Sequence, residues 1–449
     1  MGRLFGTDGA RGVANTELTC ELAMNIGKAA AMVLTKETNK KPYVIIGKDT
    51  RMSSDMLENA LAAGFCSVGA DVEILGVVPT PAVALLVKKY NADAGVMISA
   101  SHNPCEFNGI KIFNSKGYKL SDALEEQIEN IVIDNAIPYP QKVGGEVGRI
   151  TYSKRSVEDY VNAVKQTASG SFENIRIAVD CANGSSSVTA KKIFSGLGVD
   201  AIYISDNPDG VNINRNCGST YLDNLKNFVV NNSMDAGFAF DGDADRFLAI
   251  DDKGNEVDGD MLIAIFAKHL KKINKLNSNM AVVTVMSNLG FFKFCEKNNI
   301  ETCKTKVGDR YVLEEMLKHN YSIGGEQSGH IIFKEFATTG DGQLSAVQLL
   351  NIMSSSSKTL SELASEMEKY PQVLVNVRVS TFGKARFADD PEIKNAIERS
   401  ENMLGDEGRI LVRVSGTEPL IRVMVEGKDN DLIKKIAEDI ANVVKVRLI

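Results

Sequence analysis

Apolar and polar positions alternate in a way that divides most of the chain into three successive segments of one pattern. Each segment begins with a β-branched apolar run that ends in polar or glycine residues: "YVIIGKDTR", "IRIAVDCANG" and "AVVTVMSNLG". After each run, apolar residues recur three and four positions apart, at 56–68, 188–197 and 291–297. A second apolar run, another helical stretch and a third run follow. Strands that alternate with amphipathic helices predict parallel α/β layers.

The third apolar run of each segment ends in polar residues that carry chemistry. The three runs read "DAGVMISAS", "DAGFAFDGD" and "YSIGGEQSG", and the first two share Asp-Ala-Gly before three apolar residues. Ligands of α/β sheets gather beyond the carboxyl ends of the strands, where these breaks would lie. We therefore expect three similar units that present different chemistry from equivalent positions.

The last part of the chain has a different pattern. Two apolar stretches, "QVLVNVRVS" and "GRILVRVSGTEPLIRVMVEG", surround a helix near 390–400 and precede an amphipathic helix that begins at Asn430. The second stretch is typical of two strands joined by a short loop. The expected fold class is α/β, with three similar mixed-sheet domains at 1–155, 156–255 and 256–369. A smaller C-terminal α+β domain follows at 370–449.

Composition and charge exclude several classes of function. The chain has 449 residues, 44% of them hydrophobic and 24% charged, which is typical of a globular protein. A formal net charge of -7 does not favour nucleic acid or an anionic membrane as partner. Seven scattered cysteines without a C-x-x-C pair indicate a reducing compartment. With no signal-peptide pattern and no membrane-length apolar run, we expect a cytoplasmic location.

The motif "FDGDADRF" predicts a metal site. Asp241, Asp243 and Asp245 follow an apolar strand at alternate positions. Carboxylates this close repel one another unless a cation holds them, and hard oxygen ligands suit Mg²⁺. An EF-hand is excluded because its sixth position needs glycine, and Arg246 stands there. The alternative is a solvated acidic turn.

Two further motifs suit phosphate and sugar. In "RVSGTEPLIR", two arginines flank a glycine turn with hydroxyl groups, an arrangement that favours a phosphate group over a plain hairpin. The residues are Arg413, Ser415, Gly416, Thr417 and Arg422. In "GGEQSGH", Glu326 and Ser328 would receive sugar hydroxyls and His330 would move protons, although a loop of turn-forming residues is the alternative.

Basic residues among small ones mark two more loops. "FGTDGARG" and "GKDTRMSS" contribute Arg11, Lys48 and Arg51, and "NGIKIF" contributes Lys111. Together they would neutralise a phosphorylated group in one cleft, whereas singly each is typical of a surface loop.

The loop "SASHNP" contains the most informative serine. It lacks the G-x-S-x-G elbow of serine hydrolases, and the adjacent His102 does not by itself supply triad geometry. A serine near Mg²⁺ and cations is better suited to carrying a phosphoryl group. This interpretation requires Ser101 to meet the aspartate loop in space.

The ordered set of motifs resembles the α-D-phosphohexomutases, and within them the members that act on glucosamine phosphates. It comprises "FGTDGARG", "GKDTRMSS", "ISASHNP", "DGDADR", "VGDRYV", "GGEQSGH" and "RVSGTEP", which together span the whole chain. The resemblance implies four domains around a central active-site cleft, a phosphoserine at Ser101 that requires activating phosphorylation, and a possible homodimer. It implies the following site residues: catalytic Ser101, His102, Arg11, Lys111 and His330; metal-binding Ser101, Asp241, Asp243 and Asp245; sugar-binding Arg246, Gly308, Glu326 and Ser328; phosphate-binding Arg413, Ser415, Gly416, Thr417 and Arg422.

The resemblance also implies a reaction. Phosphorylated Ser101 would donate its phosphoryl group to O1 of glucosamine 6-phosphate, and the 6-phosphoryl group of the bisphosphate would return to Ser101. Mg²⁺ and glucose or glucosamine 1,6-bisphosphate would be required, and the product would feed UDP-N-acetylglucosamine and cell-wall precursor synthesis. Gln327 and the "FGTDGARG" opening resemble the members that act on glucosamine, which implies glucosamine as the sugar. The alternatives are a mutase for glucose or mannose phosphates, a phosphatase with Asp241 as nucleophile, and a non-catalytic sugar-phosphate sensor.

Overall fold

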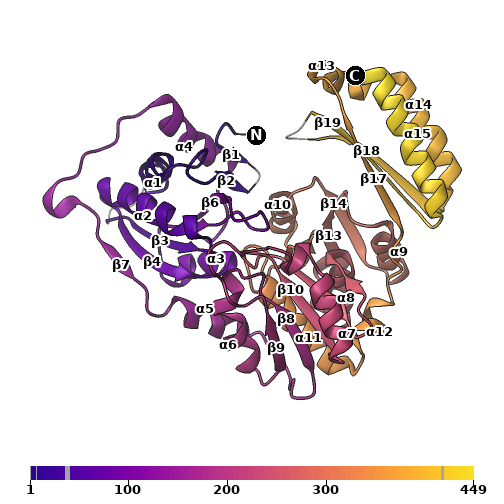
Figure 1. Ribbon diagram of the computed structural model, residues 1–449, viewed down its shortest axis with the longest axis horizontal. Coiled ribbons are helices and arrows are strands. Elements are labelled where there is room, and N and C mark those ends of the chain that lie inside the picture. The colour runs from indigo at the N-terminus through magenta and orange to yellow at the C-terminus, as the bar shows by residue number, and fades with distance from the viewer. Residues whose placement is uncertain (1, 7, 36–40, 416–418) are drawn as a thin grey trace. The chain divides into compact units, whose positions relative to one another are not determined.

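A computed structural model of the chain describes residues 2–6, 8–35, 41–415 and 419–449 (Figure 1). The chain forms two compact units. The first comprises Met1–Met286 with Ile300–Ser365, and the second comprises Ser287–Asn299 with Glu366–Ile449. Among the described residues, no helix is both long and apolar enough to cross a membrane.

The first sheet of the first unit has the strand order β1-β2-β6-β5-β3-β4-β7. Its strands are β1 (Phe5–Gly6), β2 (Gly9–Val13), β3 (Tyr43–Lys48), β4 (Asp71–Val77), β5 (Ala94–Ile98), β6 (Phe107–Asn114) and β7 (Ile150–Tyr152). Strands β3, β4, β5 and β7 are parallel, while β6, β2 and β1 continue the sheet antiparallel. Its helices are α1 (Cys20–Leu34), α2 (Met52–Ser67), α3 (Thr80–Lys89) and α4 (Asp122–Asp134).

The second sheet repeats the same design. Its order is β12-β11-β10-β8-β9, built from β8 (Arg176–Asp180), β9 (Asp200–Ile204), β10 (Ala236–Phe240), β11 (Phe247–Asp251) and β12 (Glu256–Val257). Strands β9, β8 and β10 are parallel, and β11 and β12 are antiparallel. The helices of this segment are α5 (Ser156–Lys165), α6 (Ala190–Ser195) and α7 (Asp223–Asn231).

The third sheet is a shorter version of the design. Its order is β14-β13-β15-β16, from β13 (Met280–Thr284), β14 (Glu301–Thr305), β15 (Ile323–Gly325) and β16 (Ile331–Phe333). Strands β14, β13 and β15 are parallel and β16 is antiparallel to β15. The helices of this part of the unit are α8 (Gly259–Lys272), α10 (Asp309–His319), α11 (Gly342–Ser356) and α12 (Leu360–Ala364).

In all three sheets, one parallel strand continues into an antiparallel neighbour through a functional loop. The pairs are β5 with β6, β10 with β11, and β15 with β16. The connecting loops hold the serine, aspartate and glutamate motifs, respectively. The equivalence expected from the three apolar runs is therefore present, and these loops lie at the carboxyl ends of the parallel strands.

The second unit is the smaller α+β part. Its antiparallel sheet has the order β17-β19-β18, from β17 (Gln372–Arg378), β18 (Gly408–Val414) and β19 (Leu420–Gly427). Its helices are α9 (Leu289–Lys297), α13 (Thr381–Arg386), α14 (Pro391–Leu404) and α15 (Asn430–Leu448). Buried Glu426 ties α9 to this sheet, since it accepts from Leu289 N–H at 3.1 Å and from Arg409 Nε at 2.9 Å. The four-part α/β architecture expected from the sequence is confirmed.

Candidate active site

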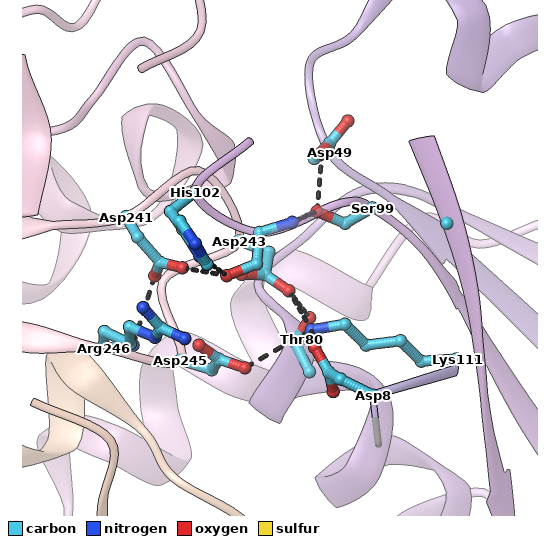
Figure 2. Close-up of polar contacts among 12 residues, drawn as sticks. Asp8, Asp49, Thr80, Ser99, His102, Lys111, Asp241, Asp243, Asp245 and Arg246 are labelled. Carbon is cyan, nitrogen blue, oxygen red and sulfur yellow. Dashed lines mark hydrogen bonds and ion pairs between the residues drawn. The ribbon is translucent and has the colours of Figure 1, made fainter. Parts of the chain in front are cut away.

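The serine loop after β5 holds Ser101 in a strained conformation. Ser101 has φ of 53°, in the left-handed region that costs a non-glycine residue about 1–3 kcal/mol. Its backbone N–H donates to Ser99 Oγ at 2.9 Å, and Ser99 Oγ in turn donates to Asp49 Oδ2 at 2.6 Å (Figure 2). Such strain persists only when surrounding groups hold it, and Ser99 is one of them.

Arg51 and Asn214 hold the carbonyl groups of the same loop. The Arg51 guanidinium is buried and donates to the carbonyls of Ser101, Asn103 and Pro104 at 3.0, 2.8 and 2.6 Å. Its Nε pairs with Asp49 Oδ2 at 2.8 Å. From the second sheet's segment, Asn214 Nδ2 donates to Ser101 and Asn103 carbonyls at 2.9 and 3.1 Å.

These contacts correct the interpretation of two basic residues as phosphate ligands. Arg51 directs its donors to backbone carbonyls, so it shapes the serine loop. Lys48 Nζ pairs with Asp55 and Glu58 at 2.7 and 2.6 Å and takes no part in the site.

The aspartate loop after β10 meets Ser101, as the phosphoryl-carrier interpretation requires. Ser101 Oγ donates to Asp241 Oδ2 at 2.6 Å, and both side chains are buried. Each aspartate of the triad offers a carboxylate oxygen within 4.8 Å of the others. The Oδ1 atoms of Asp243 and Asp245 are buried without a hydrogen-bond partner among the described residues. Buried carboxylate oxygens left unpaired suit a hard cation such as Mg²⁺.

Lys111 balances part of the negative charge of the triad. From β6, its buried Nζ lies 2.7 Å from Asp243 Oδ2 and 3.4 Å from Asp245 Oδ2 (Figure 2). Burial lowers the pKa of Lys111, but Asp243 and Asp8 outweigh burial and hold the pKa well above its usual value. Burial and the charges of Asp243 and Asp245 raise the pKa of Asp241. The triad therefore keeps uncompensated negative charge even with the Lys111 ammonium group beside it.

His102 and Arg246 complete the part of the site contributed by the first two sheets. His102 Nδ1 lies 3.3 Å from Ser101 Oγ. Burial, followed by the charges of Arg246 and Arg11, lowers the pKa of His102 to about 4. The backbone N–H of Arg246 donates to Asp241 Oδ1 at 3.2 Å. Arg11 pairs with Asp8 Oδ2, the oxygen that Lys111 Nζ also contacts at 3.0 Å.

The glutamate loop after β15 brings His330 to the triad. His330 Nδ1 lies 3.7 Å from Asp245 Oδ2, and its Nε2 accepts from Gly340 N–H at 3.0 Å. In the neutral ring, the proton is therefore on Nδ1, which faces Asp245. Burial lowers the pKa of His330, but Asp245 raises it by more, so the pKa lies above its usual value.

The other predicted sugar ligands lie on the same loop or next to it. Glu326 Oε1 accepts from Gly308 N–H at 3.0 Å, which fixes the two motifs together. Burial raises the pKa of Glu326. Ser328 is exposed at the tip of the loop. Gln327, which favoured glucosamine, directs its amide to Asp258 Oδ2 at 3.4 Å.

The predicted phosphate ligands belong to the second unit. Arg413 on β18 and Arg422 on β19 are directly paired across the strands. Burial, followed by the charge of Arg422, lowers the pKa of Arg413. An anion between these arginines would offset their repulsion. Ser415 is buried, and Gly416 and Thr417 lie outside the described residues.

Several residues around the site received no role from the sequence: Thr80 and Lys119 lie outside the motifs, and Asp8 and Asp309 lie within "FGTDGARG" and "VGDRYV". Thr80, the first residue of α3, donates its N–H to the Asp243 carbonyl at 2.9 Å and its hydroxyl to the Asp243 carboxylate. Asp8, Lys119 and Asp309 surround Lys111 and His330 with further charges. They come from separate parts of the chain, so only the folded protein brings them together.

Comparison with known proteins agrees with this geometry. Profiles of phosphoglucomutase/phosphomannomutase match the chain in order: alpha/beta/alpha domain I at 2–137, domain II at 158–254, domain III at 258–370 and the C-terminal domain at 374–443. The chain belongs to the phosphoglucomutase/phosphomannomutase family. Within this family, it is 56% identical over 448 residues to phosphoglucosamine mutase of Acetivibrio thermocellus, with 100% of both chains covered. It is 54% identical to phosphoglucosamine mutase of Clostridium novyi, with 99% of both covered.

Solved structures of the family share the fold. A phosphoglucomutase/phosphomannomutase family protein from Burkholderia thailandensis aligns with a TM-score of 0.84 at 21% identity, over 99% of this chain and 97% of the other. An N-acetylphosphoglucosamine mutase from Aspergillus fumigatus, solved with GlcNAc-6P and magnesium, aligns with a TM-score of 0.74 at 16% identity, over 99% and 96%. At these identities the likeness establishes the fold alone.

Proposed function

We propose that this protein interconverts glucosamine 6-phosphate and glucosamine 1-phosphate, with Ser101 as the phosphoryl carrier. The observation that carries the proposal is the contact of Ser101 Oγ with Asp241, within a buried aspartate triad able to hold a metal ion. A serine hydroxyl in contact with a buried carboxylate cluster suits phosphoryl transfer with the serine as carrier. The full-length relatives at 54% and 56% identity, both named phosphoglucosamine mutase, support glucosamine as the sugar.

The reaction consists of two phosphoryl transfers at Ser101. As the O1 hydroxyl of the sugar attacks phosphorus, the new O1–P bond forms and the Oγ–P bond of Ser101 breaks. The proton of the attacking hydroxyl passes to a base of the site. His102 Nδ1 lies 3.3 Å from Ser101 Oγ, whereas the two ring nitrogens of His330 already face Asp245 and the Gly340 N–H. In the second half, Ser101 Oγ attacks the 6-phosphoryl group, the new Oγ–P bond forms, the O6–P bond breaks, and the base returns the proton to O6.

Asp241, Asp243 and Asp245 would hold Mg²⁺ together with a phosphate oxygen on Ser101. When bound, the ion neutralises charge on the transferring oxygens. Lys111 supplies a fixed positive charge beside Asp243, Arg51 and Asn214 fix the loop, and Thr80 orients the Asp243 carboxylate. Glu326 and Ser328 would accept sugar hydroxyls, with Arg246 and Gly308 beside them.

The second unit would bind the phosphate group that is not being transferred. Arg413 and Arg422 present adjacent positive charges on neighbouring strands, and Ser415 follows directly. The bisphosphate must present either end to Ser101, so the same residues would hold the 1-phosphate and the 6-phosphate in turn. A homodimer and activating phosphorylation of Ser101 remain part of this proposal.

A coupled assay tests the proposal. Purified protein with Mg²⁺ and a trace of glucose 1,6-bisphosphate is offered glucosamine, glucose, mannose and N-acetylglucosamine 6-phosphates. We expect the highest kcat/KM with glucosamine 6-phosphate and no turnover of any sugar by Ser101→Ala. Higher turnover of glucose or mannose phosphate would support the alternative sugar, and no turnover of any hexose phosphate would refute a mutase.

A further inference from the structure

A closed ring of ionisable side chains surrounds one side of the active site. Lys111 Nζ contacts Asp243 and, at 3.0 Å, Asp8 Oδ2. Asp8 Oδ1 accepts from Lys119 Nζ at 2.5 Å, and the same Nζ lies 2.6 Å from Asp309 Oδ2. His330 continues the ring, since its Nε2 lies 3.5 Å from Asp309 Oδ2 and its Nδ1 faces Asp245. Lys111 Nζ, 3.4 Å from Asp245 Oδ2, closes the ring.

Among the described residues of the ring, the ion pair of Lys119 with Asp309 is the only contact that joins the first domain directly to the third. It follows the turn after β6, where it forms a β-bridge with Phe113. Asp309 is the first residue of α10, directly after Gly308. The same turn makes a second contact, since Thr338 Oγ1 donates to the Gly117 carbonyl at 2.6 Å. The turn of residues 114–119 is therefore fixed against the third domain at two points.

Lys119 lies between the carboxylates of Asp8 and Asp309, which would otherwise repel each other. The side chains of Lys119 and Asp309 are each 15% exposed, so water screens their charges little. Burial raises the pKa of Asp8, but Lys111 and Lys119 lower it by more, so Asp8 is ionised. Without the ammonium group, Asp8 Oδ1 and Asp309 Oδ2 would lose the cation between them and move apart. Arg11 and Lys111 would still contact Asp8 Oδ2, but the shifted carboxylate would move Lys111 with it, and Asp309 would change the surroundings of His330.

We propose that Lys119, held between Asp8 and Asp309, is a positioning residue that fixes Lys111 and His330 on either side of the aspartate triad. The proposal rests on the mutase function above and assigns a role that the motifs do not contain. Lys119 touches neither Ser101 nor the triad in the contacts of this structure, so it acts through Asp8 and Asp309. This bridge, Asp8–Lys119–Asp309, also couples the position of Lys111 in the first domain to that of His330 in the third.

The test uses four variants of the full-length protein and one matched control. Lys119→Met removes the charge, Lys119→Arg keeps it, Asp309→Asn removes one partner, and the fourth variant combines Lys119→Met with Asp309→Asn. The control is Arg310→Met. Arg310 also connects α10 to α4, through Asp122 and Glu125, but it lies outside the ring.

We expect Lys119→Met and Asp309→Asn each to lower kcat for glucosamine 6-phosphate by about 10- to 100-fold, the usual effect of removing a group that orients site residues. KM should change little, because the lost interaction orients groups at the reacting centre. The double variant should be no slower than the slower single variant, since both remove one bridge. Lys119→Arg should recover most of the lost kcat, and Arg310→Met should retain wild-type kcat.

The following results would overturn the proposal. Wild-type kcat in Lys119→Met, multiplied losses in the double variant, or an equal loss in Arg310→Met would each show that the bridge has no special role. If Lys119→Met does not fold, as judged by its unfolding temperature, Asp309→Asn and Lys119→Arg decide by the same criteria. Active wild-type protein with unchanged variants rejects the bridge alone, whereas inactive wild-type protein rejects the proposed function and the bridge with it.

Discussion

Replacing Arg51 with lysine tests how the serine loop is held. The change keeps a positive charge beside Asp49 but loses the planar fork that reaches three carbonyls, at 2.6, 2.8 and 3.0 Å. A hydrogen bond from a charged donor contributes about 1.5–3 kcal/mol. Asn214 still donates to two of the three carbonyls, so we expect a net loss of about 2 kcal/mol in holding the loop.

This loss is comparable to the cost of the left-handed conformation of Ser101, about 1–3 kcal/mol, so the loop relaxes in a large share of molecules. At about 1.4 kcal/mol per tenfold, kcat should fall roughly 30-fold. The assay is steady-state turnover of glucosamine 6-phosphate, with the unfolding temperature measured in parallel. Lys48→Met is the control and should keep wild-type kcat, because the Lys48 ammonium group pairs with Asp55 and Glu58 and not with the serine loop. A folded Arg51→Lys variant with wild-type kcat would refute the reasoning.

Three further predictions follow from the geometry. Asp243→Asn removes a buried, unpaired carboxylate oxygen, so the variant should need far more Mg²⁺ for half-maximal turnover; an unchanged Mg²⁺ titration would contradict the metal site. Arg413→Ala should raise KM for glucosamine 6-phosphate about 10-fold or more while Ser101 still accepts a phosphoryl group from the bisphosphate, and an unchanged KM would count against the phosphate site. Burial raises the pKa of Glu129, but hydrogen bonds from Phe5 and Leu4 N–H lower it by more, so the pKa lies below its usual value. The ionised carboxylate therefore stabilises the fold above the usual titration near pH 4.3, and this stability is lost as pH falls through the lowered pKa. Glu129→Gln should therefore flatten the acid limb of stability measured by circular dichroism, and an acid limb identical to that of the wild type would argue against this anchor.

Local patterns were enough to predict the repeated domains and the positions of the three loops. The runs that end at Ser99, Asp241 and Glu326 are buried strands followed by polar residues, and this signal depends only on neighbours in sequence. The antiparallel return strands β6, β11 and β16 were harder to predict. Their residues do not mark direction, because strand direction is set by pairing in the sheet.

Roles that depend on distant partners could not be predicted. Arg51 among small residues has the signature of a phosphate ligand, yet its partners are carbonyls some fifty residues away in sequence. Lys119 and Asp309 stand 190 residues apart, and each alone is typical of a solvated loop. Residues 287–299 pack with the second unit because Glu426 and Arg409 bind them, a non-local arrangement that no composition change marks.

The most direct test of the central claim is to follow a labelled phosphoryl group. The protein is incubated with Mg²⁺ and glucosamine 6-phosphate labelled in its phosphoryl group, and the peptides are then mapped by mass spectrometry. The account predicts label on Ser101, stable to mild base, together with labelled glucosamine 1-phosphate, and neither in Ser101→Ala. Label on Asp241 as a base-labile acyl phosphate, or turnover that persists in Ser101→Ala, would contradict it.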